Sequence, residues 1–266
     1  MSTLNFFILK ITAIQSDIFW ESSKRNIDFL QRELLSLDST DLIVLPEMFS
    51  TGFSMNVNKI AEPIFGNTFN WMKRMAKELE VSILGSIPTV ENNKFYNRLY
   101  VVNPEGFSYY DKKHLFSMAH EDLVYTHGSS ELIIELKGFK IKPLICYDLR
   151  FPVWSRNRLI ENTYDYDLLI YIANWPSVRS NVWRHLLKAR AIENLSYVMG
   201  VNRVGVDGNG IKYDGSSRVF DFKGERLDQF KDDVFFIQNL NLEKKKLDEF
   251  RTNFPALNDA DIFSFS

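Results

Sequence analysis

The sequence contains a single cysteine, Cys146, and only four histidines. One thiol cannot form an intrachain disulfide or a cysteine-based zinc cluster, which fits a reducing compartment such as the cytoplasm. It also leaves no second thiol to resolve an oxidised one, so a thiol redox enzyme is disfavoured. The histidines are scattered, and Val124 stands four residues after His120, where the zinc-protease motif needs a second histidine. We therefore predict no metal site.

Long apolar runs and an excess of one charge are also missing. The longest apolar run, residues 168–173, is too short to span a bilayer. The 32 basic and 34 acidic residues nearly balance, so no broad basic face for nucleic acid is expected. Lys10 interrupts the first apolar run and no small-residue cleavage site follows it, which indicates a strand and not a signal peptide. We predict a cytoplasmic protein that acts on a small molecule, with neither nucleic acid nor membrane as partner.

Apolar residues make up 45% of the chain and 22 residues are phenylalanine, enough for one thick interior. Apolar and β-rich segments alternate with stripes of helical spacing, which indicates an α/β fold. The residue pattern alone leaves a doubly wound sheet and a sandwich both open. The expected strands cover 6–14, 42–45, 81–87, 95–102, 107–110, 167–173, 197–201, 217–222 and 234–237, and the expected helices cover 27–37, 69–79, 183–194 and 242–250.

Cys146 follows the apolar pair Leu144-Ile145, and Pro152 suits the first turn of a following helix. The cysteine is therefore predicted at a strand-to-helix bend, where free backbone N–H groups can bind an anion. The ordinary alternative is a small buried apolar residue. An unperturbed thiol is only a few per cent ionised at neutral pH, so a catalytic cysteine needs a base or a cation beside it.

A glutamate and two adjacent lysines also follow predicted strands, as Cys146 does. Glu47 follows the predicted strand 42–45, and ligand-binding groups tend to leave α/β sheets at such carboxyl ends. Lys112 and Lys113 follow the predicted strand 107–110. Taken singly, a loop glutamate and two solvated lysines are the alternatives.

Three stretches together resemble the signatures of a known family. They are Leu45-Pro-Glu-Met-Phe-Ser-Thr-Gly-Phe53, Tyr110-Asp-Lys-Lys-His-Leu-Phe116 and Leu144-Ile-Cys-Tyr-Asp-Leu-Arg-Phe-Pro152. Their order, with Glu47, Lys112 and Cys146 at matching intervals, is similar to that of the nitrilase superfamily of carbon–nitrogen hydrolases. Within it, the chain looks most like the ω-amidases that act on 2-oxo acid amides, through Asn174-Trp-Pro176, Ala189-Arg-Ala-Ile-Glu-Asn194 and Asn202-Arg-Val-Gly-Val-Asp-Gly208.

The resemblance implies a single-domain, four-layer α-β-β-α sandwich of the nitrilase type. It implies a carbon–nitrogen hydrolase domain over residues 1–240, a homodimer, and neither metal nor cofactor. Residues 241–266 are expected to form a C-terminal helix and tail that packs on the domain or on a second subunit. Ile262, Phe263 and Phe265 give the tail its apolar character.

The resemblance also implies a mechanism. Cys146 would attack an amide carbon to form a thioester, Glu47 would carry protons, and Lys112 with the backbone N–H of Tyr147 would hold the oxyanion. Neighbours on an extended segment point to opposite sides, so only one of Lys112 and Lys113 can face the site. The family pattern Lys-x-His-Leu-Phe selects Lys112.

Further site residues are expected with less specificity. Glu121 matches a second glutamate that family members place near the lysine. Trp175, Phe116 and Tyr147 adjoin the motifs and are expected to line the pocket, with core packing as the alternative. An acidic substrate needs a cationic partner, and the candidates are Arg150, Arg179 and Arg203, although Arg150 could instead pair with Asp148.

Other functions stay open at this point. The same three residues would serve an N-carbamoyl amino acid amidohydrolase or a nitrilase, because only the pocket distinguishes these substrates. A non-catalytic binding protein could keep the fold. A papain-like site would need a histidine partner for Cys146, and nothing in the sequence marks one.

Overall fold

Two large β-sheets form the centre of the computed structural model, which describes residues 7–261, 263 and 264. The larger sheet has the strand order β16-β1-β2-β4-β5-β6, with β3 paired to β4. Its strands are β1 (Ile8–Gln15), β2 (Leu42–Val44), β3 (Glu62–Pro63), β4 (Ser82–Glu91), β5 (Lys94–Val102), β6 (Phe107–Asp111) and β16 (Phe236–Glu243). Phe6 of the predicted first strand lies outside the described residues.

The smaller sheet has the order β15-β12-β11-β8-β7. Its strands are β7 (Ile134–Leu136), β8 (Phe139–Ile145), β11 (Leu168–Ala173), β12 (Tyr197–Asn202) and β15 (Arg218–Phe220). Two short hairpins lie outside both sheets, β9 (Leu159–Ile160) with β10 (Thr163–Tyr164), and β13 (Val204–Val206) with β14 (Lys212–Asp214). Strands β8, β11 and β12 are parallel, as are β1, β2 and β4.

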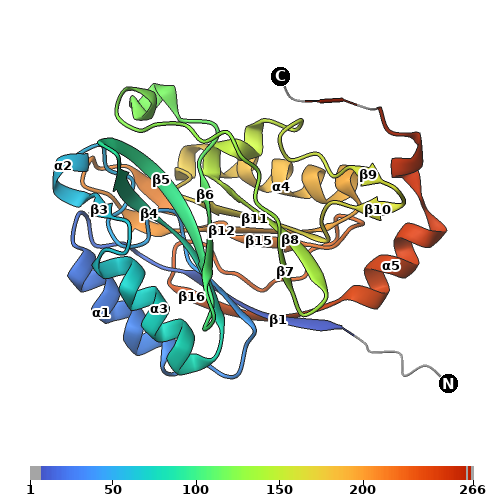
Figure 1. Cartoon of the computed structure of the whole chain (residues 1–266), viewed down its shortest axis with the longest axis horizontal. Coiled ribbons are helices and arrows are strands. Elements are labelled where there is room, and N and C mark those ends of the chain that lie inside the picture. Colours follow the sequence, from blue (N-terminus) through green and yellow to red (C-terminus); the bar gives the residue numbers. More distant parts are fainter. Residues whose placement is uncertain (1–6, 262, 265–266) are drawn as a thin grey trace.

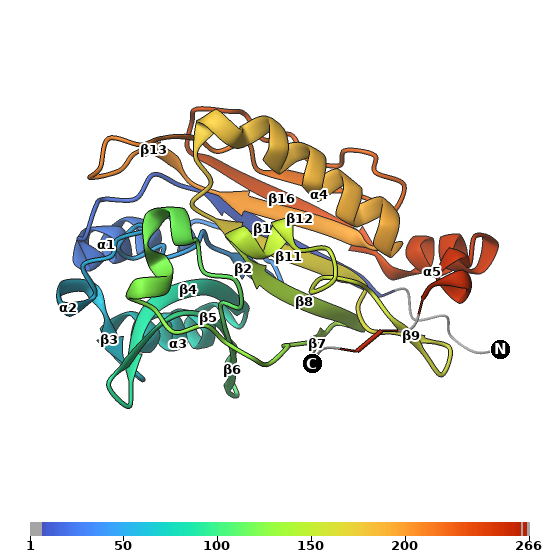
Figure 2. The same ribbon diagram turned by 90° about the horizontal axis from the view of Figure 1, so that it is seen from above.

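Helices cover the outer faces of the two sheets. The α-helices are α1 (Ser23–Leu34), α2 (Val57–Ile60), α3 (Asn67–Leu79), α4 (Ser180–Asn194) and α5 (Lys244–Asn253), and the 3₁₀ helices are η1 (Ser117–Ala119), η2 (Glu121–Leu123), η3 (Cys146–Arg150), η4 (Ser177–Arg179) and η5 (Ala256–Asp259). Figures 1 and 2 show α1 and α3 together at one side of the molecule and α4 at another. No helix in the described part of the chain is long and apolar enough to cross a membrane.

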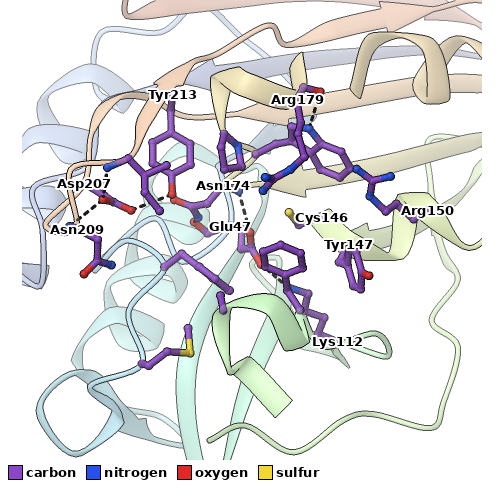
Figure 3. A pocket seen from close by; sticks show the side chains of 17 residues that line it. Glu47, Lys112, Cys146, Tyr147, Arg150, Asn174, Arg179, Asp207, Asn209 and Tyr213 are labelled. Atoms are coloured by element: carbon purple, nitrogen blue, oxygen red, sulfur yellow. Dashed lines mark hydrogen bonds and ion pairs between the residues drawn. The ribbon is translucent and has the colours of Figure 1, made fainter. Parts of the chain in front are cut away.

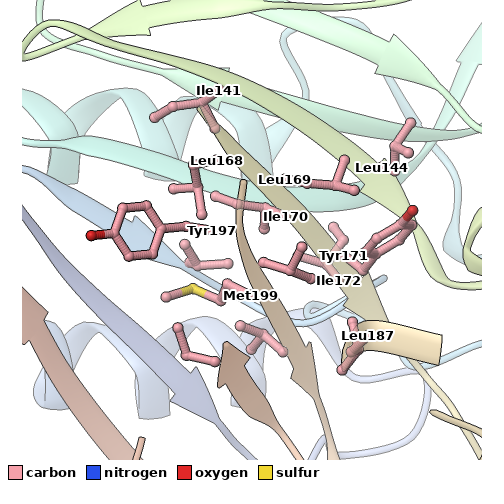
Figure 4. Packing of buried hydrophobic residues seen from close by; sticks show 14 of the residues in the cluster. Ile141, Leu144, Leu168, Leu169, Ile170, Tyr171, Ile172, Leu187, Tyr197 and Met199 are labelled. Carbon is pink, nitrogen blue, oxygen red and sulfur yellow. The ribbon is translucent and has the colours of Figure 1, made fainter. Parts of the chain in front are cut away.

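The two-residue period of the strands divides the core into layers. On β2, Ile43 packs with α1 and α3 in one cluster, while its neighbours Leu42 and Val44 pack in a second cluster that joins the two sheets and extends to α4. That second cluster also takes Leu168 and Ile170 from the smaller sheet (Figure 4). Each fully buried aliphatic side chain contributes roughly 1.5–3 kcal/mol to folding. The layering confirms the predicted α-β-β-α sandwich.

Helix α4 lies unusually close to the smaller sheet. Trp183 and Leu187 of the helix are fully buried in the same cluster as β12. A Cβ added at Gly200 of β12 would stand 2.4 Å from a methyl carbon of Leu187 and 2.6 Å from the ring of Trp183. Only glycine allows this approach of α4 to β12.

The C-terminal region differs from the sequence prediction. Strand β16 pairs with β1 as far as Glu243, so the predicted helix start at 242 is wrong and a boundary at 240 would fall within a strand. Helix α5 then packs on its own chain, where Arg251 pairs with Asp167 at 2.6 Å and Leu247 is buried. Ile262 and Phe265 lie outside the described residues. The domain division and the homodimer stay predictions.

Candidate active site

Glu47 leaves the larger sheet three residues beyond the end of β2 and is completely buried. Its Oε1 accepts hydrogen bonds from Lys112 Nζ at 2.9 Å and from Asn97 Nδ2 at 2.8 Å. Its Oε2 accepts one from the backbone N–H of Asn174 at 2.7 Å. The carboxylate is therefore held from both sides, and the alternative of an exposed loop acid is wrong.

Lys112 follows β6 and is 1% exposed. Besides Glu47, its Nζ contacts both carboxylate oxygens of Glu121, at 2.9 and 3.0 Å. Burial alone would lower the pKa of Lys112, but the charges of Glu121 and Glu47 outweigh it and raise the pKa overall. The group is therefore an ammonium ion. Lys113 points elsewhere, with its Nζ over the ring of Trp154.

Glu121 is as deeply buried as Lys112, in the 3₁₀ helix η2. Its Oε2 accepts the backbone N–H of Phe116 at 2.6 Å, which fixes the loop that carries Phe116. Burial raises the pKa of Glu121, and the attraction of Lys112 offsets only part of this effect. Asn97 donates to both glutamates, at 2.8 and 3.2 Å, and so joins them across the ammonium ion.

Cys146 lies at the carboxyl end of β8 with φ +44°. A non-glycine residue in this left-handed region costs about 1–3 kcal/mol and is frequent at functional sites. The bend is where the sequence predicts it, but the helical turn begins at Cys146 itself and ends at Arg150. Pro152 lies in the turn beyond it, so the prediction that this proline starts a helix is wrong. Proline lacks the N–H that a continued helix would use.

Burial raises the pKa of the Cys146 thiol well above its ordinary range, and the negative charge of Glu47 raises it further. The ammonium of Lys112 opposes both effects only in part. The resting sulfur is therefore a protonated thiol. The residue keeps some solvent exposure on the pocket side. This arrangement places a thiol, a base and a cation in one place.

Glu47, Lys112 and Cys146 line one cavity of about 120 Å³ (Figure 3). The predicted wall residues Phe116, Tyr147 and Trp175 also line it. Phe116 and Tyr147 pack edge to face with ring centroids 5.0 Å apart. The cavity therefore suits a small molecule.

Arg150 and Arg179 line the same cavity. Arg150 stacks over Trp175 at 5.1 Å and Arg179 over Phe116 at 5.5 Å. Within the described residues neither guanidinium group pairs with a carboxylate, and the alternative that Arg150 pairs with Asp148 is not observed. Figure 3 shows the guanidinium group of Arg179 extending toward Cys146. The pocket thus presents two cations that are free to bind an anion.

Arg203 does not reach the cavity, and its prediction as a substrate contact is wrong. The side chain is fully buried and pairs with Asp17 at 2.8 Å. Its guanidinium group lies 4.7 Å from the ring centroid of Tyr213, which itself lines the pocket. Arg203 follows the carboxyl end of β12 as Glu47 follows β2, but the partner at Asp17 directs it behind the pocket wall.

Sequence reasoning assigned no role to several residues of the site. Asn174 follows β11 at a carboxyl end, the same signal that identified Glu47. Asn97 is a buried amide within β5, next to the buried Arg98. The hairpin of β13 and β14 also contributes Asp207 and Tyr213, whose hydroxyl donates to Asp207 at 2.9 Å. In the described residues, no group of three His, Cys, Asp or Glu side chains is placed to hold a metal ion.

The family model for carbon–nitrogen hydrolases matches residues 12–237. The chain belongs to the carbon–nitrogen hydrolase family. It is 43% identical to "Omega-amidase YafV" of Escherichia coli K12 over 96% of this chain and 98% of that protein. It is 34% identical to "2-oxoglutaramate amidase" of Bacillus subtilis, covering 82% and 84% of the two chains.

A solved carbon–nitrogen hydrolase has nearly the same structure. The protein XC1258 of Xanthomonas campestris, described as a CN-hydrolase superfamily protein with an arsenic adduct in its active site, superposes with a TM-score of 0.94. It is 40% identical and the match covers 97% of this chain and 99% of that one. The predicted membership of the nitrilase superfamily is confirmed, and so is its fold.

Proposed function

We propose that this carbon–nitrogen hydrolase is an ω-amidase. It cleaves the terminal amide of a small 2-oxo acid amide, such as 2-oxoglutaramate or 2-oxosuccinamate, to a carboxylate and ammonia. The observation that carries the proposal is the convergence of Glu47, Lys112 and Cys146 in a pocket with two arginines that pair with no carboxylate among the described residues. The names of the E. coli and B. subtilis relatives support the same substrate class.

The first half of the reaction forms a thioester. Glu47 removes the proton of the Cys146 thiol as the sulfur attacks the amide carbon, because the raised thiol pKa leaves too little thiolate without a base. The Lys112 ammonium and the backbone N–H of Tyr147 hold the oxyanion of the tetrahedral intermediate. Glu47 then delivers the proton to the departing nitrogen, and the carbon–nitrogen bond breaks to release ammonia.

The second half returns the enzyme to its starting state. Glu47 takes a proton from a water molecule as the water oxygen attacks the thioester carbon. The same oxyanion donors serve again, and the carbon–sulfur bond breaks. The thiolate regains the proton from Glu47, so each cycle consumes one amide and one water. Glu121 keeps Lys112 aligned through both halves by its two contacts at 2.9 and 3.0 Å.

Arg150 and Arg179 orient the substrate in the pocket. A 2-oxo acid amide carries a carboxylate at the end opposite the scissile amide, and guanidinium groups bind carboxylates with paired hydrogen bonds. Arg150 and Arg179 lie over the rings of Trp175 and Phe116 and have no competing acidic partner in the described chain. Binding the carboxylate there leaves the amide carbon at Cys146.

Replacing Lys112 with alanine should reduce kcat by about 100- to 1000-fold or more, because one oxyanion donor is lost. Glu47 and Glu121 would then face each other without a cation, and one of them would bind a proton. Ammonia release measures the effect, and thermal unfolding shows that the fold survives. Lys113→Ala is the matched control and should stay within about threefold of the wild type. Near wild-type turnover by Lys112→Ala would contradict the role.

Replacing Arg150 or Arg179 with glutamine should raise KM for an anionic ω-amide about 10- to 100-fold, because a charge-assisted hydrogen bond is lost. The same variants should hydrolyse a neutral amide of equal length as the wild type does, since that substrate has no carboxylate. Steady-state kinetics on the two substrates measures the ratio. An equal loss on both would show that the arginines only shape the pocket.

The substrate class is tested by a panel read out as ammonia. Amides of 2-oxo acids should give the highest kcat/KM, above N-carbamoyl amino acids and nitriles of the same length. Activity on nitriles alone would overturn the ω-amidase proposal while leaving the hydrolase family intact.

We also propose that the protein is a homodimer in the cytoplasm. Light scattering of the purified protein would test the dimer, and cell fractionation would test the location.

A further inference from the structure

Lys112 and Cys146 come from different sheets. Lys112 follows β6, at the edge of the larger sheet, and Cys146 follows β8 of the smaller one. No ladder hydrogen bonds join β6 to β8, since the sheets meet face to face. The spacing of ammonium and thiol therefore depends on whatever connects the loop after β6 to the turn after β8.

The carboxylate of Asp148 makes that connection. It is completely buried, two residues after Cys146 in the 3₁₀ helix η3. On the Cys146 side, its Oδ2 accepts the backbone N–H of Ile145 at 3.0 Å. On the Lys112 side, its Oδ1 accepts the backbone N–H of His114 at 3.0 Å and lies 2.8 Å from Nδ1 of the same residue.

A tyrosine extends the connection to the other side of Lys112. The hydroxyl of Tyr110 donates to Oδ2 of Asp148 at 2.8 Å. The hydroxyl oxygen of Tyr110 in turn accepts the backbone N–H of Lys113 at 3.1 Å and the indole N–H of Trp154 at 3.0 Å. The residues on both sides of Lys112 are thus tied to one carboxylate, which also anchors the strained turn at Cys146.

We propose that Asp148 is a positioning residue that sets the Lys112 ammonium against the Cys146 thiol for amide hydrolysis. The proposal rests on the hydrolase function above. Asp148 holds the backbone on each side and touches no reacting atom. Three donors and Nδ1 of His114 face its two oxygens. Asparagine cannot accept all three hydrogen bonds in the same way, because its amide group is itself a donor.

The test compares Asp148→Asn with the wild type. A misplacement of about 1 Å costs about 100-fold, so kcat should fall by about that factor while KM stays within about threefold. Asp228→Asn is the matched control, because Asp228 is a buried acid that accepts the backbone N–H groups of Val219 and Phe230 away from the site. It should lower the melting temperature and leave kcat unchanged.

A double variant separates positioning from a general loss of structure. If Asp148 acts through Lys112, the double variant Lys112→Ala/Asp148→Asn should have a kcat within about threefold of that of Lys112→Ala alone. The proposal would be overturned if the kcat losses of Lys112→Ala and Asp148→Asn multiplied in the double variant, or if Asp148→Asn alone kept the wild-type kcat. Should Asp148→Asn fail to fold, Tyr110→Phe keeps the ring and should lower kcat about tenfold with the same non-additivity. A wild-type enzyme without amidase activity would instead contradict the proposed function.

Discussion

Replacing Cys146 with alanine is expected to lower amide turnover by about 10⁴- to 10⁶-fold, as loss of a catalytic nucleophile does. The variant loses the only group that can form the thioester, and no other cysteine exists in the chain to substitute for it. Alanine tolerates φ +44° no worse than cysteine, so the bend after β8 should persist. The measurement is ammonia release from an ω-amide, with enzyme in excess to detect slow turnover.

Substrate binding provides the control for this variant. Arg150 and Arg179 remain in place, so the dissociation constant of the unreacted amide should stay within about threefold of the wild-type value. Calorimetric titration of Cys146→Ala with 2-oxosuccinamate measures it directly. Residual turnover above about 1% of wild type would show that the sulfur is not the nucleophile, and lost binding would show that the pocket has collapsed.

Replacing Glu47 with glutamine should lower kcat for amides by about 10³- to 10⁴-fold, because one group carries protons in both halves of the reaction. Glutamine keeps an oxygen for the backbone N–H of Asn174 but presents an NH₂ group where the carboxylate now accepts from Lys112 and Asn97. Glu121 still neutralises the ammonium, so the fold should survive with a reduced melting temperature.

An activated ester separates the two duties of Glu47. A p-nitrophenyl ester has a leaving group that needs no proton, and the substitution removes the Glu47 charge that raises the pKa of the Cys146 thiol. Glu47→Gln should therefore still acylate Cys146, more slowly than the wild type, and then stall before hydrolysis. The expected signal is a burst of nitrophenol close to one per active site, followed by a slow steady rate. A variant that hydrolyses ester and amide with equal loss and no burst would assign Glu47 a structural role only.

The sequence predicts the elements of the fold better than their assembly. Runs such as residues 168–173 are buried on both faces in a sandwich and in a doubly wound sheet alike, so the run cannot distinguish them. The pairing of β1 with β16 joins residues more than 220 positions apart, as in Ile8 with Glu243, and no local pattern encodes it. The sandwich was predicted only through the three family signatures.

The same limit applies to the site. Glu47 and Cys146 could be located because each follows a buried strand at its carboxyl end. That signal also selects Arg203, and it fails there because the salt bridge to Asp17 is a contact between distant segments. Asn97 carries no marker in the sequence, and Asp207 stands in a subfamily stretch that gives it no role, since a buried amide and a hairpin acid become site residues only once the sheets have packed.

The most direct test of the account is to trap the intermediate on the wild-type enzyme. Acid quenching during turnover of 2-oxosuccinamate, followed by intact-mass and peptide analysis, should find one acyl group on Cys146, bound as a thioester that hydroxylamine removes. Amide turnover at the full rate with the Cys146 peptide unmodified at every time point would contradict a covalent mechanism based on this thiol.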